Sequence, residues 1–326
     1  MKLKTLILAL VALMALSIAA CGDDDDDDGG GGEVQAPEGT DLGSLQGDIR
    51  IDGSSTVFPF GQAGAELFRE AGAENVNVTV GQSGTGGGFE KFCAGETDIS
   101  NASRPIDEEE EVPICEEEGV RYEEIQVAND GIAVVTNPGL EVDCLTVDQL
   151  KQIWDEGSKV KNLKEVDPAL PDAELSLYGP GTDSGTFDFF TEQVNGEEGQ
   201  SRSDYSASED DNVLVQGVSG DEGGLGYFGF SYAQQNQDQL NIVNIDSGDG
   251  NCVEPSDETI QNGTYKPLSR PLFMYPSAEA IGKPHVKGFM DFIAQNHQTI
   301  AETAQFVPMT DQQAQQSTQK LEGLGG

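Results

Sequence analysis

Three times along this chain of 326 residues, a short apolar run leads through a turn of glycine and hydroxyl residues into a helical pattern. The turns span residues 52–59 (Asp-Gly-Ser-Ser-Thr-Val-Phe-Pro), 81–88 (Gly-Gln-Ser-Gly-Thr-Gly-Gly-Gly) and 179–186 (Gly-Pro-Gly-Thr-Asp-Ser-Gly-Thr). Apolar runs of strand length that alternate with helical patterns are typical of α/β architecture. The repeated order of strand, polar turn and helix therefore predicts an α/β fold.

Further elements follow from the same patterns. Residues 145–154 form an amphipathic pattern capped by Thr146, in which we expect Trp154 to belong to the core. Residues 125–127 and 132–136 indicate two strands on either side of Asn129, Asp130 and Gly131. Helices at residues 287–294 and 299–304 are expected to pack on the first domain.

The polar turns suit a small anion. The first N–H groups of a helix have no internal partner, and the helix dipole places partial positive charge at that end. An ordinary Ser or Thr cap is the alternative at each turn taken alone. Because the third turn follows a predicted crossing into a second domain, the helix starts can face each other across a cleft. Such a cleft can replace the water around a tetrahedral oxyanion with N–H and hydroxyl donors.

The chain begins with the pattern of an export signal. Basic residues at its start and an apolar stretch from Leu6 to Ala20 are typical of a signal peptide, and the sequence Ile-Ala-Ala-Cys at residues 18–21 is similar to a bacterial lipobox. We expect cleavage before Cys21 and lipidation (palmitate among the acyl chains) of that cysteine. A plain secretory site with a chance cysteine is the alternative. Residues 21–44, with six aspartates and four glycines in succession, are expected to form a solvated tether.

The net charge of −42 excludes some partners. Nucleic acid is not expected to bind, because 59 acidic residues face only 17 basic ones. The same charge repels a diffusing anion. Screening ends that repulsion beyond about 8–10 Å at physiological salt, so local dipoles can still prevail inside a cleft.

Four cysteines follow Cys21, and an even number in an exported chain indicates two disulfides with three possible pairings. We favour Cys93–Cys115, which is local, and Cys144–Cys252, which ties the start of the middle segment to its end. Zinc binding is the alternative, but no CxxC or HxxxH spacing supports it. No metal and no other cofactor is expected.

Five motifs in this order resemble the phosphate-binding proteins of bacterial ABC-type phosphate importers. They are the turns at 52–59 and 83–88, residues 98–105 (Asp-Ile-Ser-Asn-Ala-Ser-Arg-Pro), 183–186 and 224–227 (Gly-Leu-Gly-Tyr). The resemblance spans residues 48–309. It implies a two-domain periplasmic-binding-protein-like (class II) fold with a hinge and an inter-domain ligand cleft. We expect residues 45–130 and 268–326 to form domain I and residues 131–267 to form domain II.

The resemblance also assigns ligand-binding residues. On the first domain these are Ser55, Thr56, Val57 (through its backbone N–H) and Ser83, and on the second domain Ser184, Gly185 and Thr186.

Two positions depart from the best-known members of the family. Arg104 stands where those members have an aspartate, and Pro180 stands in place of an arginine shortly before the Ser-Gly-Thr turn. We hypothesise that the roles are exchanged, so that Arg104 supplies the cation and Asp183, or else Asp130, accepts the proton of monohydrogen phosphate. The alternative is that Arg104 forms a structural ion pair and that Asp183 only caps its helix.

The function implied by the resemblance is extracytoplasmic binding of inorganic phosphate and its delivery to the permease subunits of an ABC importer by hinge closure. We expect a monomer that meets the membrane only through its lipid anchor. A receptor for sulfate or molybdate, or a phosphate sensor, would share the same features. Catalysis is disfavoured because there is no GxSxG elbow, and the two histidines, His285 and His297, lie far in sequence from Ser184.

Overall fold

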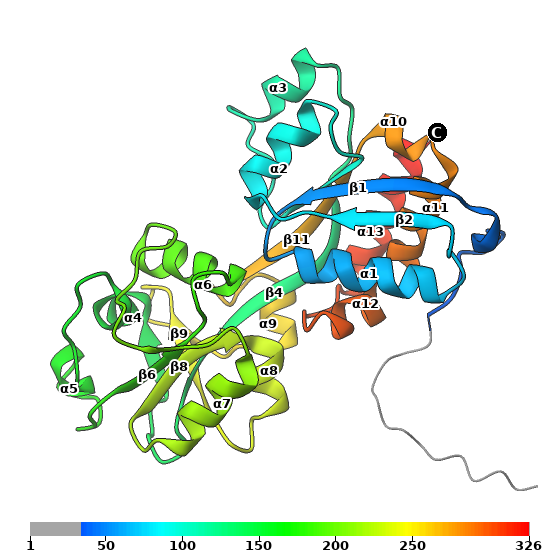
Figure 1. Cartoon of the computed structure of the whole chain (residues 1–326). Coiled ribbons are helices and arrows are strands. Elements are labelled where there is room, and N and C mark those ends of the chain that lie inside the picture. Colours follow the sequence, from blue (N-terminus) through cyan, green and yellow to red (C-terminus); the bar gives the residue numbers. More distant parts are fainter. Residues whose placement is uncertain (1–33, 326) are drawn as a thin grey trace, which may run out of the picture. The chain divides into compact units, whose positions relative to one another are not determined.

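The computed structural model describes residues 34–325 (Figure 1), so the predicted signal peptide and Cys21 lie outside the described residues. The strands are β1 (Gly47–Gly53), β2 (Val76–Val80), β3 (Ile99–Ala102), β4 (Ile125–Thr136), β5 (Cys144–Thr146), β6 (Ser176–Gly179), β7 (Ser206–Ala207), β8 (Gly224–Gly229), β9 (Asn241–Asp246), β10 (Cys252–Val253) and β11 (Ser269–Pro276).

The helices are α1 (Phe58–Glu70), α2 (Gly84–Cys93), α3 (Val112–Glu117), α4 (Val147–Trp154), α5 (Leu163–Val166), α6 (Gly185–Phe190), α7 (Asp211–Gly220), α8 (Phe230–Gln235), α9 (Asp257–Gln261), α10 (Ala278–Ile281), α11 (Pro284–Gln295), α12 (His297–Thr303) and α13 (Asp311–Leu324). A 3-10 turn η1 (Leu42–Ser44) and a π-helical turn η2 (Thr191–Asn195) complete the set. None of the helices in this part of the chain combines the length and the apolar composition that crossing a membrane requires.

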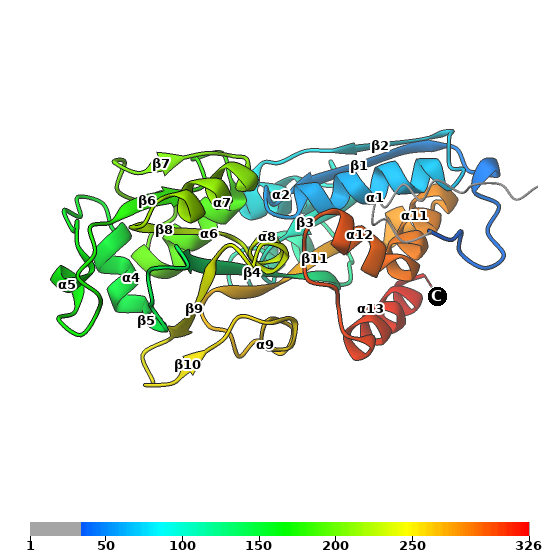
Figure 2. The ribbon, with the colours of Figure 1, turned by 90° about the horizontal axis from the view of Figure 1, so that it is seen from below.

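The strands follow the order β2-β1-β3-β11-β4-β8-β6-β7, and β9 pairs with β4, β5 and β10. Strand β1 runs parallel to β2 and β3, whereas β11 is antiparallel to both β3 and β4. Strands β4 and β8 are antiparallel, and β6 runs parallel to β8. This mixture of strands and helices confirms the predicted α/β class. Two views at right angles show β4 and β11 passing between the end of the sheet with β1 and the end with β8 (Figures 1 and 2).

Strand β4 is continuous, and the prediction of two strands separated by residues 129–131 was wrong. Its first half pairs with β11 and its second half pairs with β8 and β9. Asn129 remains in the strand because its backbone bonds to Val307 and its side chain donates to the Pro308 carbonyl at 3.2 Å. A Cβ at Gly131 would lie 2.5 Å from Cδ1 of the buried Ile260 side chain, so a larger residue there would require Ile260 to move.

Two large hydrophobic clusters flank this crossing. In the cluster around β1, Phe68 of α1 packs on Phe289 and Phe292 of α11 with ring centroids 5.3 and 5.2 Å away. In the cluster around β8, Trp154 is fully buried against Phe190 and Tyr227, which confirms its predicted place in the core. The two separate clusters define a lobe I around β1 and a lobe II around β8, and the exact domain boundaries stay a prediction.

The residues just before β1 belong to lobe I rather than to the tether in which we expected them. Leu42 is buried in the lobe I core. Gln35 exchanges two backbone hydrogen bonds with the Asn296 side chain, at 2.8 and 2.9 Å. An apolar contact and a reciprocal amide pair therefore hold this segment on lobe I, and the exact end of the tether stays a prediction.

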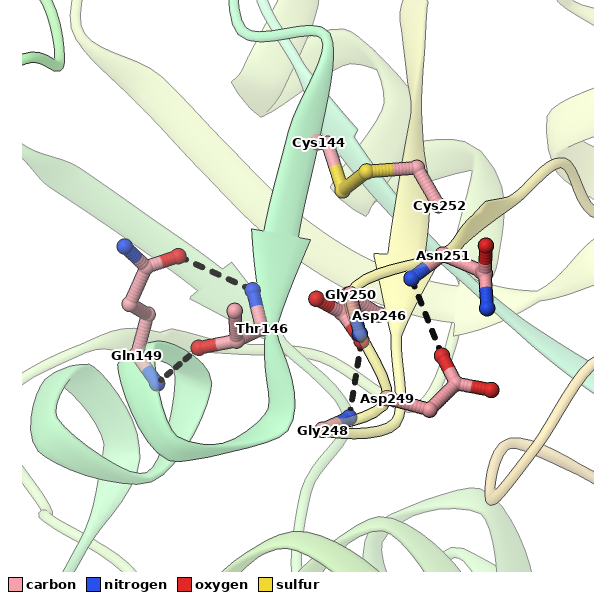
Figure 3. Close-up of a disulfide and its surroundings, with 9 residues drawn as sticks. All are labelled: Cys144, Thr146, Gln149, Asp246, Gly248, Asp249, Gly250, Asn251 and Cys252. Carbon is pink, nitrogen blue, oxygen red and sulfur yellow. Dashed lines mark hydrogen bonds between the residues drawn. A yellow bond between two sulfur atoms is a disulfide. The ribbon is translucent and has the colours of Figure 1, made fainter.

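Both favoured disulfides are present. Cys93 and Cys115 join α2 to α3 with Cα atoms 4.4 Å apart, and Cys144 and Cys252 join the starts of β5 and β10 at 6.0 Å. Figure 3 shows the second disulfide beside the predicted α4 cap, in which Thr146 and Gln149 satisfy each other's backbone amides. The second disulfide closes lobe II across a sequence separation of 108 residues.

Candidate functional site

The first and third polar turns meet between the lobes. The Thr56 hydroxyl, just before α1, donates to the Gly185 carbonyl of lobe II at 3.4 Å. A Cβ on Gly185 would lie 2.4 Å from the Thr56 Oγ1 atom, so only glycine permits this approach. Ser184 caps α6 by accepting a hydrogen bond from the Thr186 amide at 3.2 Å. The structure thus brings Thr56, Ser184, Gly185 and Thr186 together, and their role in ligand binding stays a prediction.

An arginine that the sequence analysis did not single out lies at this junction. Arg270, at the start of β11, pairs with Asp130 of β4 at 3.2 Å. Its Nη2 atom donates to Thr56 Oγ1 at 2.7 Å and to the Gly185 carbonyl at 3.3 Å. Its guanidinium also lies over the Phe189 ring, 3.7 Å from the centroid. Arg270 therefore contacts both lobes at one point.

The Arg270–Asp130 pair is largely withdrawn from water, with side-chain exposures of 12% and 9%. Burial lowers the pKa of Arg270, and the Asp130 carboxylate opposes that shift. None of the described residues accepts a hydrogen bond from Arg270 Nη1, and none donates one to Asp130 Oδ1. The site thus offers a buried cation and a buried acceptor, each with an atom available to a ligand.

One sequence signal could have revealed Arg270. It precedes Pro271 in the segment that returns to lobe I, just as Arg104 precedes Pro105, and basic residues are scarce in this chain. A residue before proline is biased to an extended conformation, which suits a strand edge.

Two pockets meet at Ser55 and Thr56. The first, of about 590 Å³ and here named the Asp130 pocket, is lined among others by Ser55, Thr56, Asp130, Asp183, Ser184, Gly185, Thr186, Glu209 and Asp211. The second, of about 450 Å³ and here named the Arg270 pocket, is lined among others by Ser55, Thr56, Ser83, Arg104, Asp188, Glu192, Glu198 and Arg270. Val57 is fully buried and lines neither pocket.

Ser83 lines the Arg270 pocket, but its donors are engaged. Its amide and its hydroxyl both donate to Asp52, which also pairs with Lys91 at 2.7 Å. Burial alone would raise the pKa of Asp52, but the hydrogen bonds from Lys91 and Ser83 lower it, so this carboxylate keeps the Ser83 donors. A role for Ser83 in ligand binding stays a prediction.

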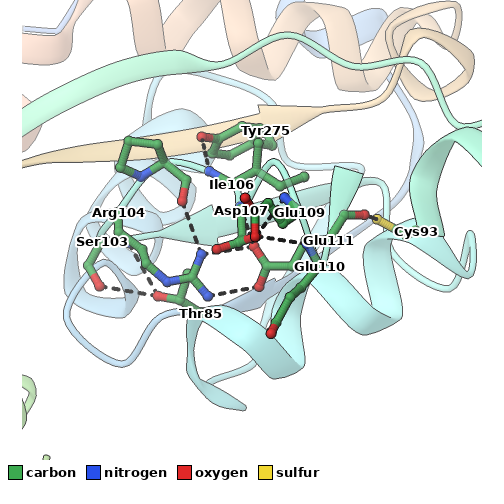
Figure 4. Close-up of polar contacts among 11 residues, drawn as sticks. Thr85, Cys93, Ser103, Arg104, Ile106, Asp107, Glu109, Glu110, Glu111 and Tyr275 are labelled. Carbon is green, nitrogen blue, oxygen red and sulfur yellow. Dashed lines mark hydrogen bonds and ion pairs between the residues drawn. The ribbon is translucent and has the colours of Figure 1, made fainter. Parts of the chain in front are cut away.

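Arg104 is held by a partner on its own lobe. Two parallel hydrogen bonds of 2.8 Å join its guanidinium to Glu111, and a third reaches the Pro105 carbonyl (Figure 4). The hydrogen bonds with Glu111 raise the pKa of Arg104. This is the structural ion pair that we named as the alternative to a ligand-binding role.

Asp183 is exposed, and its backbone amide faces Glu209 at 3.4 Å. Ser184 caps α6 in its place. Asp183 and Arg104 line different pockets, so the hypothesis that these two residues exchange roles has no support from their contacts.

Two carboxyl groups beside the junction have raised pKa values. Burial, together with Glu198, raises the pKa of Asp188 to about 6. Burial also raises the pKa of Asp211 to about 7, against a hydrogen bond from the Gly229 amide. Acidic side chains are abundant here, but no group of three or more His, Cys, Asp or Glu among the described residues has the arrangement of a metal site.

Several known proteins are similar to this chain in sequence or in fold. Residues 35–297 match the family model described as the PBP superfamily domain. Protein SphX of Synechococcus elongatus is 46% identical over 84% of this chain and 81% of its own. The phosphate-binding protein PstS of Staphylococcus saprophyticus is 39% identical over 88% of both chains. The crystal structure of a possible phosphate-binding protein from Planctomyces limnophilus is 43% identical and covers 87% of this chain and all of its own, with a TM-score of 0.81.

Proposed function

The chain belongs to the PBP superfamily and, within it, to the family of the PstS phosphate-binding proteins, and on that premise we propose that it binds inorganic phosphate between its lobes. The observation that carries the proposal is the position of Arg270, which joins Thr56 of lobe I to Gly185 of lobe II through hydrogen bonds from one nitrogen. Because Arg270 contacts both lobes, an anion bound to its guanidinium would hold the two lobes together.

Phosphate would lie against the first and third turns. The hydroxyls of Ser55 and Ser184 and the Gly185 amide at the start of α6 supply donors, in keeping with anion binding at a helix N-terminus. The Thr56 hydroxyl would turn to the ligand from the Gly185 carbonyl, to which it donates in this structure. Arg270 Nη1 supplies a charge-assisted hydrogen bond from within a site that excludes much of the water. In this assignment Arg270 supplies the cation, a role that the sequence analysis gave to Arg104.

Asp130 would accept the proton of monohydrogen phosphate. Its Oδ2 atom binds Arg270, which leaves Oδ1 for the ligand. Sulfate carries no such proton and would leave a buried carboxylate facing its oxygens without a hydrogen bond, which penalises the wrong anion. The sequence analysis gave the role of proton acceptor to Asp183 or else Asp130, and we assign it to Asp130.

Delivery to the permease subunits of an ABC importer completes the proposed function. The resemblance to phosphate receptors of such importers supports it, as does the predicted signal peptide with a lipidated Cys21, which would hold a monomer at the outer face of the cell membrane. A receptor for sulfate or molybdate remains the alternative that ligand competition separates. Turnover of a chromogenic phosphate ester would instead indicate an enzyme.

The test is titration calorimetry with phosphate and with sulfate. We expect Arg270→Ala to weaken phosphate binding about 100-fold, because removing one partner of a buried charged contact costs about 2–5 kcal/mol. Arg270→Lys keeps the charge without the planar fork and is expected to recover only part of that loss. Asp130→Asn should narrow the preference for phosphate over sulfate.

Arg104→Ala is the matched control, since it removes an arginine that also precedes a proline and lines the Arg270 pocket. It should change the affinity less than about threefold, because the Arg104 guanidinium is already bound by Glu111. A larger loss of phosphate affinity in Arg104→Ala than in Arg270→Ala would show that Arg104 supplies the cation and would contradict the assignment.

A further inference from the structure

One wall of the Arg270 pocket is unusually acidic for an anion site. Asp188 lies in the first turn of α6, Glu192 lies in η2, and Glu198 follows shortly after η2. The backbone amide of Asp188 donates to the Ser184 carbonyl at 3.1 Å, which fixes the residue beside the third polar turn. A phosphate bound to Arg270 where the two pockets meet would therefore have three carboxyl groups on this side.

The surroundings of Asp188 favour its neutral form. Carboxylates approach it from three segments, namely Glu198, Asp183 and Glu209, while Arg270 of β11 is the cation that favours its ionised form. Glu192 lines the same pocket, and the buried Tyr227 hydroxyl of β8 lies within electrostatic range. Burial and the surplus of negative charge raise the pKa of Asp188 to about 6, so a small additional negative potential suffices to protonate it near neutral pH.

We propose that the cleft takes up a proton together with phosphate, and that the carboxyl group of Asp188 holds this proton. The proposal rests on the phosphate-binding function proposed above. Monohydrogen phosphate brings two negative charges into a partly buried site, and its repulsion of an ionised carboxylate is strongest there. The proton comes from the solvent and forms an O–H bond on one carboxyl oxygen, which removes one of the charges that oppose the ligand.

Asp188 is a better candidate than Asp211 for geometric reasons. Asp188 shares the Arg270 pocket with the cation, and the next residue, Phe189, supports the guanidinium. Asp211 lines the other pocket, where Asp210, Glu209 and Asp130 are the carboxylates around it and the Gly229 amide already binds it. A phosphate that binds Arg270 Nη1 and Asp130 Oδ1 lies where the two pockets meet, and Asp188 is the carboxyl group with a raised pKa on the side of the cation.

The experiment counts protons. Phosphate is titrated into the protein near pH 7 in two buffers with different ionisation enthalpies, and the difference in heat gives the number of protons taken up per phosphate. The wild type should take up about 0.3–0.9 more protons than Asp188→Asn. Protonation of phosphate itself contributes equally to both proteins and cancels in this difference.

The affinity supplies a second readout. Between pH 6 and 8 the wild-type affinity should fall with rising pH relative to that of Asp188→Asn, by at most about tenfold per pH unit, which is the limit for one linked proton. Asp148→Asn is the matched control, because Asp148 lies in the first turn of α4, is exposed and lines neither pocket. It should behave as the wild type.

Three outcomes would overturn the proposal. Equal proton uptake by the wild type and by Asp188→Asn would exclude Asp188 as the proton site. Loss of the uptake in Asp211→Asn with retention in Asp188→Asn would assign the proton to the opposite wall. Absence of phosphate binding by the wild type would refute the proposed function and this inference together, whereas binding without linked protons would refute this inference alone.

Discussion

Two arginines of this molecule each precede a proline, line the same pocket and pair with an acidic residue, yet their surroundings differ. Arg104 forms two hydrogen bonds to Glu111 with 45% of its side chain exposed, and all its partners belong to lobe I. Arg270 is 12% exposed, pairs with Asp130 and touches both lobes. Position in a pocket is therefore not enough to identify a binding cation. Burial, and hydrogen bonds to both lobes, make the difference.

The largest difference between the Arg270–Asp130 and Arg104–Glu111 ion pairs is expected in the free energy of unfolding. Asp130→Ala leaves a buried guanidinium unpaired and is expected to lower the free energy of unfolding by about 3–5 kcal/mol. Glu111→Ala opens an ion pair whose arginine is 45% exposed, so water can solvate the guanidinium, and it should lower this free energy by only about 1 kcal/mol. Urea denaturation without ligand measures both. Equal losses would show that the two arginines do not differ in the way that their exposure indicates.

A methyl group added beside each arginine tests which region must close around a ligand. Gly185→Ala places a Cβ 2.4 Å from Thr56 Oγ1, so we expect the turns to separate and phosphate to bind about 10–100-fold more weakly. Gly86→Ala is the control in the Arg104 region, since its nearest neighbour would be 3.9 Å away. Calorimetry should find its affinity unchanged. A weak effect of Gly185→Ala would contradict the tight contact between the lobes.

The pH dependence of stability should also differ between the regions. The folded-state pKa of Asp211 is raised to about 7, so its contribution to stability is complete below the unfolded pKa and is lost as the pH rises through about 7. Asp211→Asn should therefore stabilise the protein at pH 8 by about 1–2 kcal/mol and change it little at pH 4. Near Arg104, backbone hydrogen bonds from Glu110 and Glu109 lower the pKa of Asp107, and Asp107→Asn should lose stability at pH 8 instead.

The smallest expected effect concerns the aromatic rings next to each guanidinium. Arg270 lies 3.7 Å from the Phe189 centroid, whereas Arg104 lies 5.8 Å from that of Phe89. Phe189→Leu should weaken phosphate binding by about 1 kcal/mol, or roughly fivefold, through the lost cation–π contact. Phe89→Leu should affect stability but not affinity. A similar loss of affinity in both variants would mean that core packing, not the ring charge distribution, supports the site.

The parts of this fold that sequence could predict depend on local patterns. The polar turns, the Thr146 cap and the buried Trp154 follow from residue spacing alone, and both disulfides pair as favoured. The continuity of β4 could not be predicted, because Asn129 and Asp130 are held in the strand by partners from the distant end of the chain. Arg270 could not be predicted for the same reason. Its role depends on contacts with Thr56 and Gly185, which are 214 and 85 residues away in the sequence.

The uninterrupted path of β4 determines how the lobes can move. Each lobe is joined to the other through a paired strand ladder of β4 and β11 rather than through loose linkers, and the Ile132 amide still bonds to the Leu268 carbonyl at 2.9 Å where the pairing changes partners. Paired strands keep their hydrogen bonds over a range of twist angles. Rotation of one lobe against the other would thus twist this ladder at the point where β4 changes partners, between Gly131 and Ile132.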